Sequence, residues 1–364
     1  MFPGLFSLAR QVLFQFSPED AHNITLTSLE HGLHPRAPQD IDPALHVSAF
    51  GLNFPNPVGI AAGFDKDARV PDAVLAMGCG FAEIGTVTPQ PQDGNPKPRI
   101  FRLPNDHAVI NRLGFNNGGH AAALTRLERR KKQNGIVGVN IGANKDSSDR
   151  IADYVAGIRA FHKLASYFVI NISSPNTPGL RNLQAADALD DLLARVMSAR
   201  TKATDAEDRR PAVLVKIAPD LTPDELNQTI SQLIAHNVDG IAVSNTTLSR
   251  GGLTERENIE SGGLSGRPLF ERSTIMLARV FQQTEGKIPL IGIGGIDSGT
   301  TAVEKIKAGA TLLQLYTGLI YEGPGLIPRI NTALKNACRT SGVNTISELR
   351  GTTVDAWATK SLGT

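Results

Sequence analysis

The chain has 364 residues, of which 41% are hydrophobic and 20% charged, a globular composition that suits one large α/β domain or two smaller ones. Its net charge of +2 and its aromatic content of 5% argue against a nucleic-acid-binding surface. The two cysteines, Cys79 and Cys338, match no metal-binding spacing, which favours free thiols in a reducing compartment.

The first 40 residues predict two helices. The first, over residues 3–16, has an apolar and a polar face. The apolar face consists of Leu5, Leu8, Ala9, Val12, Leu13 and Phe16, and the polar face of Ser7, Gln11 and Gln15, with Arg10 near the edge and Phe14 as an apolar exception. A second helix follows the start signal Ser17-Pro18-Glu19-Asp20 and continues to about His31, where Gly32 is a plausible stop.

This helical pair is either a cap under the following domain or a contact surface for lipid. Its apolar content is larger than a small cap requires, which favours a membrane surface or a lipid-like ligand. The residues concerned are Phe2, Leu5, Phe6, Leu13, Phe14 and Phe16. No apolar stretch approaches the roughly 20 residues of a membrane span, and Arg10 interrupts the N-terminal run, which argues against a secretory signal.

Eight short runs rich in β-branched residues follow, and they predict strands. Most are too apolar to alternate, as is typical of parallel strands buried on both faces. They cover residues 56–64, 81–88, 135–143, 166–175, 212–219, 240–247, 288–296 and 311–318. Helical patterns lie between most of them, including residues 185–201, 223–236 and 298–308. This alternation predicts an α/β fold, a (β/α)8 TIM barrel, with a doubly wound open sheet as the alternative.

Residues 89–134, between the second and third strands, form a long insertion. Loops of this length in compact domains are usually functional, and an insertion after a barrel strand lies on the catalytic face. We divide the chain into an N-terminal extension, residues 1–40, and a barrel, residues 41–364.

Polar residues gather at the predicted carboxyl ends of the strands, where a barrel has its active site. The segment Asn171-Ile172-Ser173-Ser174-Pro175-Asn176-Thr177 places amides and hydroxyls where a buried strand opens into a loop. An ordinary polar turn is the alternative. Other asparagines point to the same mouth, and together they favour a planar ligand rich in carbonyl and N–H groups. They are Asn111, Asn116, Asn140 and Asn245.

Two further features indicate ligand chemistry. Lys216 lies in mid-strand between Val215 and Ile217, and a buried lysine there needs an anion or must lose its proton. It could form a Schiff base with a carbonyl substrate, hold the electron-rich part of a cofactor, or extend to the barrel rim. The glycine turns after strands seven and eight, at Gly294-Gly295 and Tyr316-Thr317-Gly318, predict a phosphate cup.

Four motifs closely resemble the dihydroorotate dehydrogenases, specifically their membrane-associated, quinone-using class. The resemblance covers nearly the whole chain, from Pro18-Glu19-Asp20-Ala21-His22 to Tyr316-Thr317-Gly318. The motifs are Ala61-Ala62-Gly63-Phe64-Asp65-Lys66, Asn111-Arg112-Leu113-Gly114-Phe115-Asn116-Asn117, the Asn171–Thr177 segment, and Ser244-Asn245-Thr246-Thr247.

The resemblance implies one FMN per chain and a pyrimidine carboxylate, dihydroorotate, as substrate, with orotate as product. The FMN residues would be Ala61, Ala62, Gly63, Lys66, Thr86, Asn140, Asn171, Lys216 and Ser244, with Gly266, Gly295, Tyr316 and Thr317 at the phosphate. The substrate residues would be Lys66, Asn111, Arg112, Leu113, Gly114, Phe115, Asn171, Asn176, Asn245 and Thr246. Lys216 would then be a cofactor contact, where a cation favours negative charge on the flavin ring.

The implied reaction removes a proton from C5 of dihydroorotate and a hydride from C6, in de novo pyrimidine biosynthesis. Ser174 would be the base, passing its proton onward through Thr177 or a water, since an alcohol is a poor base at neutral pH. Cytosolic classes of the family have cysteine at this position. The N-terminal helices would form a quinone tunnel docked on the membrane.

These implications favour a peripheral protein on the cytoplasmic side of the inner membrane, with no nucleic acid and no obligate protein partner. Two alternatives from other mechanistic classes remain at this stage. One is a Schiff-base lyase or aldolase that uses Lys216. The other is a non-catalytic barrel docked on membranes.

Overall fold

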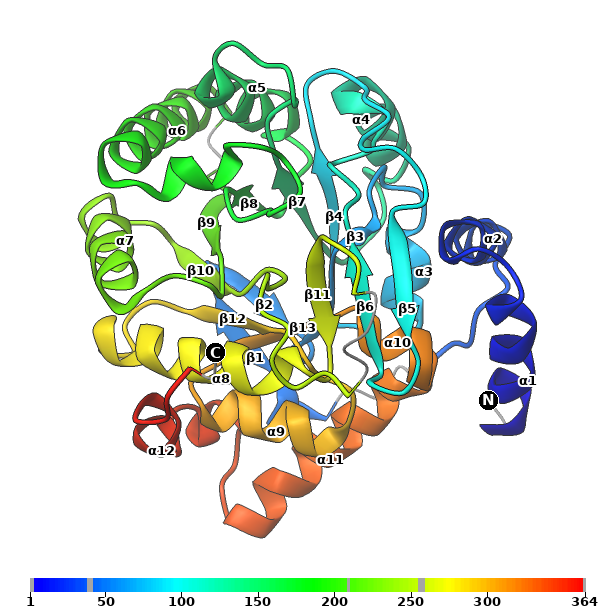
Figure 1. Cartoon of the computed structure of the whole chain (residues 1–364). Coiled ribbons are helices and arrows are strands. Elements are labelled where there is room, and N and C mark those ends of the chain that lie inside the picture. The colour runs from blue at the N-terminus through cyan, green and yellow to red at the C-terminus, as the bar shows by residue number, and fades with distance from the viewer. Residues whose placement is uncertain (1–2, 38–41, 208–209, 255–258, 363–364) are drawn as a thin grey trace.

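The computed structural model of the protein describes residues 3–37, 42–207, 210–254 and 259–362. Eight parallel strands form a closed barrel, and their order around the barrel is their order in the sequence (Figure 1). The strands are β3 (Val58–Asp65), β4 (Phe81–Val87), β7 (Ile136–Ile141), β8 (Tyr167–Asn171), β9 (Ala212–Ile217), β10 (Gly240–Val243), β12 (Leu290–Ile293) and β13 (Leu312–Leu315). The predicted (β/α)8 barrel is confirmed, and the open sheet is wrong.

Helices connect the strands and surround the barrel (Figure 1). They are α3 (Pro71–Ala76), α4 (Gly119–Arg129), α5 (Arg150–Phe161), α6 (Ala186–Glu207), α7 (Pro223–Ala235), α8 (Leu269–Gln283), α9 (Gly299–Lys307), α10 (Thr317–Glu322), α11 (Leu326–Ser341) and α12 (Val354–Ala358). Three 3₁₀ turns, η1 (Pro43–Leu45), η2 (Leu180–Gln184) and η3 (Ile346–Leu349), supplement them. Helix α6 extends beyond the predicted residue 201 because no glycine or proline interrupts the chain before Pro211.

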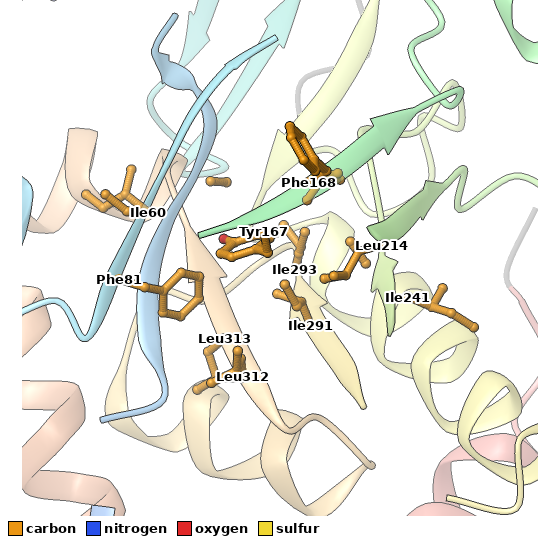
Figure 2. Close-up of a cluster of buried hydrophobic side chains, with 14 of the residues drawn as sticks. Ile60, Phe81, Tyr167, Phe168, Leu214, Ile241, Ile291, Ile293, Leu312 and Leu313 are labelled. Carbon is orange, nitrogen blue, oxygen red and sulfur yellow. The ribbon is translucent and has the colours of Figure 1, made fainter. Parts of the chain in front are cut away.

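Aromatic rings fill the lower part of the barrel. Tyr167 and Phe168 lie on opposite sides of their strand, as the two-residue period of a strand requires (Figure 2). The ring of Tyr167 lies 6.3 Å from that of Phe81, centroid to centroid. A Cβ on Gly59 would lie 2.5 Å from the Phe81 ring, so glycine there leaves room for it. This interior packing closes the amino-terminal half of the barrel and leaves the carboxyl ends of the strands for the site.

A hairpin closes the bottom of the barrel. It consists of β1 (Val47–Ala49) and β2 (Leu52–Phe54), and Phe54 contacts Phe81 with ring centroids 5.3 Å apart. The N-terminal helices, α1 (Pro3–Phe14) and α2 (Pro18–Glu30), therefore do not cap the bottom. They lie beside the barrel next to β5 (Figure 1).

The mouth of the barrel carries a separate antiparallel sheet. Its strands are β5 (Ile100–Leu103), β6 (Ala108–Asn111) and β11 (Gly263–Gly266), in the order β11-β6-β5. The first two belong to the predicted insertion, whose last part is the regular barrel helix α4 and not an insertion. The third comes from a second insertion, between β10 and α8, which the sequence patterns did not reveal because β11 is short and glycine-bounded.

Helix α2 begins where predicted, and ion pairs attach it to the barrel. The amide of Asp20 donates to Ser17 Oγ over 3.2 Å, the expected N-cap bond. Arg99 donates to both carboxylate oxygens of Glu19, and Arg69 to both of Glu30. The boundary predicted between residues 40 and 41 lies outside the described residues, so the two-part division remains a prediction.

Candidate active site

One cavity of about 530 Å³ opens at the carboxyl ends of the barrel strands and continues to α1 and α2. The predicted site residues that line it are Ala61, Ala62, Gly63, Lys66, Thr86, Asn111, Leu113, Gly114, Phe115, Asn171, Ser174, Asn176, Lys216, Ser244, Asn245, Thr246, Gly266, Gly295, Tyr316 and Thr317. Residues from both insertions thus meet around one space. They are joined there by the carboxyl ends of the barrel strands other than β7 and by the segments that follow those strands.

A chain of buried hydrogen bonds crosses the floor of this cavity. Asn171 Nδ2 donates to Thr86 Oγ1 over 2.8 Å, and Thr86 donates to Asn140 Oδ1 over 2.6 Å. Asn140 in turn donates to Glu83 Oε1 over 2.9 Å. These connected hydrogen bonds fix the orientation of the Asn171 amide, which could otherwise rotate. Asn140 itself does not line the cavity, and it supports Thr86 from behind.

The loop after β8 carries Ser174 into the cavity. Ser174 is buried, and its Oγ accepts the amide of Asn176 over 3.3 Å. Asn176 Nδ2 donates to Asn111 Oδ1 over 3.1 Å, which joins the loop to strand β6. Thr177 Oγ1 is buried, and it has no hydrogen-bond partner among the described residues. The loop therefore presents the Ser174 hydroxyl to the cavity. The Thr177 hydroxyl, three residues later in the sequence, has no hydrogen-bond partner among the described residues.

Arg112 is the second predicted residue that does not line the cavity. Its guanidinium donates to Glu260 over 2.6 Å and lies 4.5 Å from the centroid of the Phe101 ring. The side chain thus connects the two insertions outside the cavity. The substrate contact expected of Arg112 stays a prediction, because the structure shows only that its charged end is paired with Glu260. Asn116, expected at the same mouth, instead lines an adjacent polar cavity between α2 and the first insertion.

Two lysines give the cavity its positive charge. Lys216 is 5% exposed, and burial lowers its pKa. Burial is also the main cause that lowers the pKa of Lys66, to about 8. Neither ammonium group has an ion pair or hydrogen bond among the described residues. Acidic groups interact favourably with these lysines without pairing directly with them, Glu83 with Lys216 and Asp67 with Lys66. Because a buried cation without a direct partner is costly, the two lysines favour a ligand with negative charge in this cavity.

The opposite wall of the cavity has the features of a phosphate cup. Gly294, Gly295 and Gly266 all have positive φ, between +70° and +106°, a conformation in which glycine is favoured. Thr317 Oγ1 lies 2.9 Å from Ser265 Oγ at the same place. Two buried oxygens in the cavity, Gln314 Oε1 and Thr246 Oγ1, have no partner among the described residues. The lysines, the glycine turns and these oxygens fit a group with a phosphate and a polar ring.

The far end of the cavity is apolar and is formed by α1 and α2 with the barrel. Leu13, Phe14 and Leu29 line it, together with His22 and Arg102. Burial is the main cause that lowers the pKa of His22 to about 3, so the imidazole is neutral. Phe14 and Arg10 of α1 line the cavity, although the sequence pattern predicts Phe14 as an exception on the polar face and Arg10 near its edge. The sequence patterns assigned no role to His22, in the segment Pro18-Glu19-Asp20-Ala21-His22, or to Arg102, in the insertion over residues 89–134.

The fold and this cavity define a barrel enzyme that binds an anionic ligand at its carboxyl-terminal mouth. Residues 44–338 match the family model described as dihydroorotate dehydrogenase. A Brucella ovis protein named dihydroorotate dehydrogenase (quinone) is 59% identical over 362 residues, covering 99% of each chain, as is one from Brucella abortus. The chain belongs to the dihydroorotate dehydrogenase family, as the motifs predicted.

A solved structure agrees with this assignment. The crystal structure of the Eimeria tenella dihydroorotate dehydrogenase in complex with ferulenol is 39% identical in sequence, with a TM-score of 0.89 over 92% of this chain and 95% of that one. Because members of this family are oxidoreductases, the Schiff-base lyase and the non-catalytic barrel are wrong.

Proposed function

We propose that the protein oxidises dihydroorotate to orotate with FMN and passes the electrons to a membrane quinone, as a step of de novo pyrimidine biosynthesis. The observation that carries this proposal is the single cavity that joins the Ser174 loop to the apolar space between α1, α2 and the barrel. A water-soluble anion and a lipid-soluble acceptor can thus reach the same cofactor from different directions.

The substrate binds among the amides at the polar end. Asn111, Asn176 and Asn245 present amide groups that can both donate to and accept from a pyrimidine ring. Lys66 lines the same cavity, and its ammonium has no hydrogen bond or ion pair among the described residues, so it can attract the substrate carboxylate. Asn171 is already oriented by Thr86. A planar carboxylate is therefore held in one pose by groups that need little rearrangement.

Ser174 removes the proton from C5 of the substrate. Its hydroxyl is a weak base, so its own proton must move on as the substrate proton arrives. Thr177 is the candidate acceptor, since its buried Oγ1 has no partner among the described residues. The bond from the Asn176 amide orients the Ser174 oxygen. The serine, together with the absence of a cysteine from this loop, separates this chain from the classes that use a thiol.

FMN, when bound, supplies the two-electron chemistry that takes hydride from C6 and later yields electrons to the quinone. Lys216 holds the ring from within the barrel, and Thr86, Asn171 and Ser244 line it. The phosphate binds where Gly266, Gly295, Tyr316 and Thr317 meet. Lys216 has no hydrogen bond or ion pair among the described residues, although Glu83 interacts with it favourably, and a bound cofactor would give its ammonium a direct partner.

The quinone enters between α1 and α2 from the membrane surface. The docking surface consists of exposed apolar residues on these helices and in the segments that directly follow them: Leu8, Val12, Phe16, Ile24 and Leu33. No helix among the described residues is long and apolar enough to cross a bilayer. The proposal, which rests on the family resemblance and on this exposed apolar surface, is a peripheral protein on the cytoplasmic side of the inner membrane, without nucleic acid or an obligate protein partner.

Anaerobic mixing tests the proposal. The purified protein is combined with dihydroorotate while the flavin absorbance is followed, and a quinone is then added. We expect bleaching on the first addition and recovery on the second. A colourless preparation that takes up no FMN contradicts the cofactor assignment, and a flavin that dihydroorotate leaves oxidised contradicts the substrate.

A further inference from the structure

The loop that carries Ser174 is held in place by an arginine seven residues further along the chain. Arg181 lies in η2, between β8 and α6. Its Nε donates to the carbonyl oxygen of Ser173 over 3.0 Å, and its Nη2 donates to that of Thr246 over 3.1 Å. The third nitrogen, Nη1, donates to Asp220 Oδ2 over 3.0 Å. One planar guanidinium thus connects the segments that follow three successive barrel strands, β8, β9 and β10.

Asp220 extends this connection. Its Oδ2 also accepts the amide of Leu248 over 3.0 Å, and its Oδ1 accepts the hydroxyl of Thr247. Arg272, from α8, lies 3.9 Å from the same carboxylate. Asp220 therefore orients both Arg181 and the backbone that follows Thr246. A charge-assisted bond of this kind is stronger and more directional than a neutral one.

The Ser173 carbonyl is part of the peptide bond that leads into Ser174. The side chain of Ser173 is held separately, because Asn245 Nδ2 donates to its Oγ over 3.0 Å. Fixing both the carbonyl and the side chain of the preceding residue leaves the Ser174 backbone little freedom to rotate. The same guanidinium holds the carbonyl of Thr246, whose side chain lines the substrate end of the cavity. The base and the substrate-binding strand end are thereby held in one geometry.

We infer that Arg181 is a positioning residue that sets the distance between Ser174 and the bound substrate, with Asp220 as its partner. This inference rests on the proposed function. Arg181 contacts neither the cavity nor α1 and α2, so its role is confined to the half-reaction with dihydroorotate. Displacement of a reacting group by about 1 Å costs roughly a hundredfold in rate. An ordinary surface ion pair contributes far less, because solvent screens it.

The test compares two half-reactions of the FMN-loaded protein. Arg181→Gln removes the three-way fork, and Arg181→Lys keeps the charge alone. Arg195→Gln is the matched control, since Arg195, on α6, forms an exposed ion pair with Asp149, the N-cap residue of α5. Flavin bleaching is followed at saturating dihydroorotate, and reoxidation is followed after chemical reduction and mixing with quinone. Orotate affinity is measured separately by thermal shift, and unfolding by denaturant.

We expect Arg181→Gln to slow bleaching about a hundredfold while the dissociation constant of orotate changes less than about threefold. The bleaching rate of Arg181→Lys lies between that of Arg181→Gln and that of the wild type, and the bleaching rate of Arg195→Gln matches that of the wild type. The rate of flavin reoxidation by quinone stays within about twofold of the wild-type rate in all of these variants. Combining Arg181→Gln with Asp220→Asn slows bleaching little more than Arg181→Gln alone, because the two residues act as one unit.

Two outcomes overturn the inference. One is a bleaching rate for Arg181→Gln within about twofold of the wild type. The other is a parallel loss of bleaching, reoxidation and stability, which indicates a structural role only. Neither is confused with failure of the proposed function, because in that case the wild-type flavin itself is not bleached by dihydroorotate.

Discussion

The two ends of the cavity differ in how they are built. At the polar end, short loops from successive barrel strands are cross-linked by side-chain hydrogen bonds, such as those of Asn171, Asn245 and Arg181. At the apolar end, α1 is attached mainly by Arg10, which donates to the Tyr321 carbonyl, and by Arg102, which donates to carbonyls at the end of α1. The first end is suited to hold one geometry, and the second to admit a variable lipid.

This contrast follows from the chemistry of the two molecules. Proton and hydride removal from dihydroorotate depends on atoms placed within a fraction of an ångström, which favours rigid strand ends. Electron transfer to a quinone depends on access from a lipid phase, which favours helices with apolar faces on both sides. The comparison therefore predicts that changes at one end leave the other half-reaction nearly intact.

Ser174→Ala tests this separation with the largest expected effect. The variant keeps its flavin, because Ser174 supports no other described side chain, but bleaching by dihydroorotate slows by about 10²–10⁴-fold. Stopped-flow absorbance under anaerobic conditions measures it. Reoxidation of the chemically reduced variant by quinone proceeds at the wild-type rate. An unchanged bleaching rate removes Ser174 from the role of base.

Deleting residues 1–35 tests the opposite end. The truncated protein loses both helices, so quinone turnover falls by tenfold or more while bleaching by dihydroorotate stays within about threefold. Flavin content and circular dichroism check that the barrel remains folded, since Arg99 and Arg69 lose their partners on α2. Normal quinone turnover after the deletion contradicts the tunnel.

Much of this arrangement could be predicted from the sequence. The barrel strands were visible because parallel strands buried on both faces form continuous apolar runs, as at Tyr167–Asn171. The site residues were visible because a barrel brings strand ends together whatever their spacing in the chain. Lys216 stood out because its apolar neighbours predict that it is buried, and a buried lysine is costly unless it has a partner.

The remaining features depend on contacts that no local pattern records. Strand β11 is short, and its pairing with β6 joins residues about 150 positions apart. The motif predicts Arg112 as a substrate residue, which stays a prediction, but no local pattern indicates that its guanidinium pairs with Glu260 of the other insertion. The inward face of α1 differs from the predicted apolar face, because Leu8 and Val12 of that face are exposed whereas Arg10 and Phe14 line the cavity, and apolar residues on two sides of a helix do not indicate which side is inward.

Lys66 offers a pH-dependent test of the polar end, with a smaller effect. Burial lowers its pKa to about 8, so the ammonium is charged below that pH and neutral above it. Orotate affinity should be constant below pH 8 and fall by up to about tenfold per pH unit above it. Lys66→Met should bind orotate weakly and lose the fall in affinity above pH 8. Lys132→Met, on the exposed surface, should keep this pH dependence. Titration by flavin absorbance measures both; a pH dependence that survives in Lys66→Met would assign it to Lys216, whose pKa is also lowered.

The smallest expected effect concerns the outer face of α1. Leu8 is 61% exposed there, and Ile234, on α7 across the barrel in Figure 1, is 44% exposed. If α1 docks on the membrane, Leu8→Gln should weaken binding to vesicles about fivefold, by the roughly 1 kcal/mol that burial of part of a leucine contributes. Ile234→Gln should leave it unchanged. Co-sedimentation with vesicles measures the partition, and a short-chain water-soluble quinone should be reduced equally by both variants. Equal losses for the two variants would show that exposed apolar area alone, and not this helix, determines the attachment.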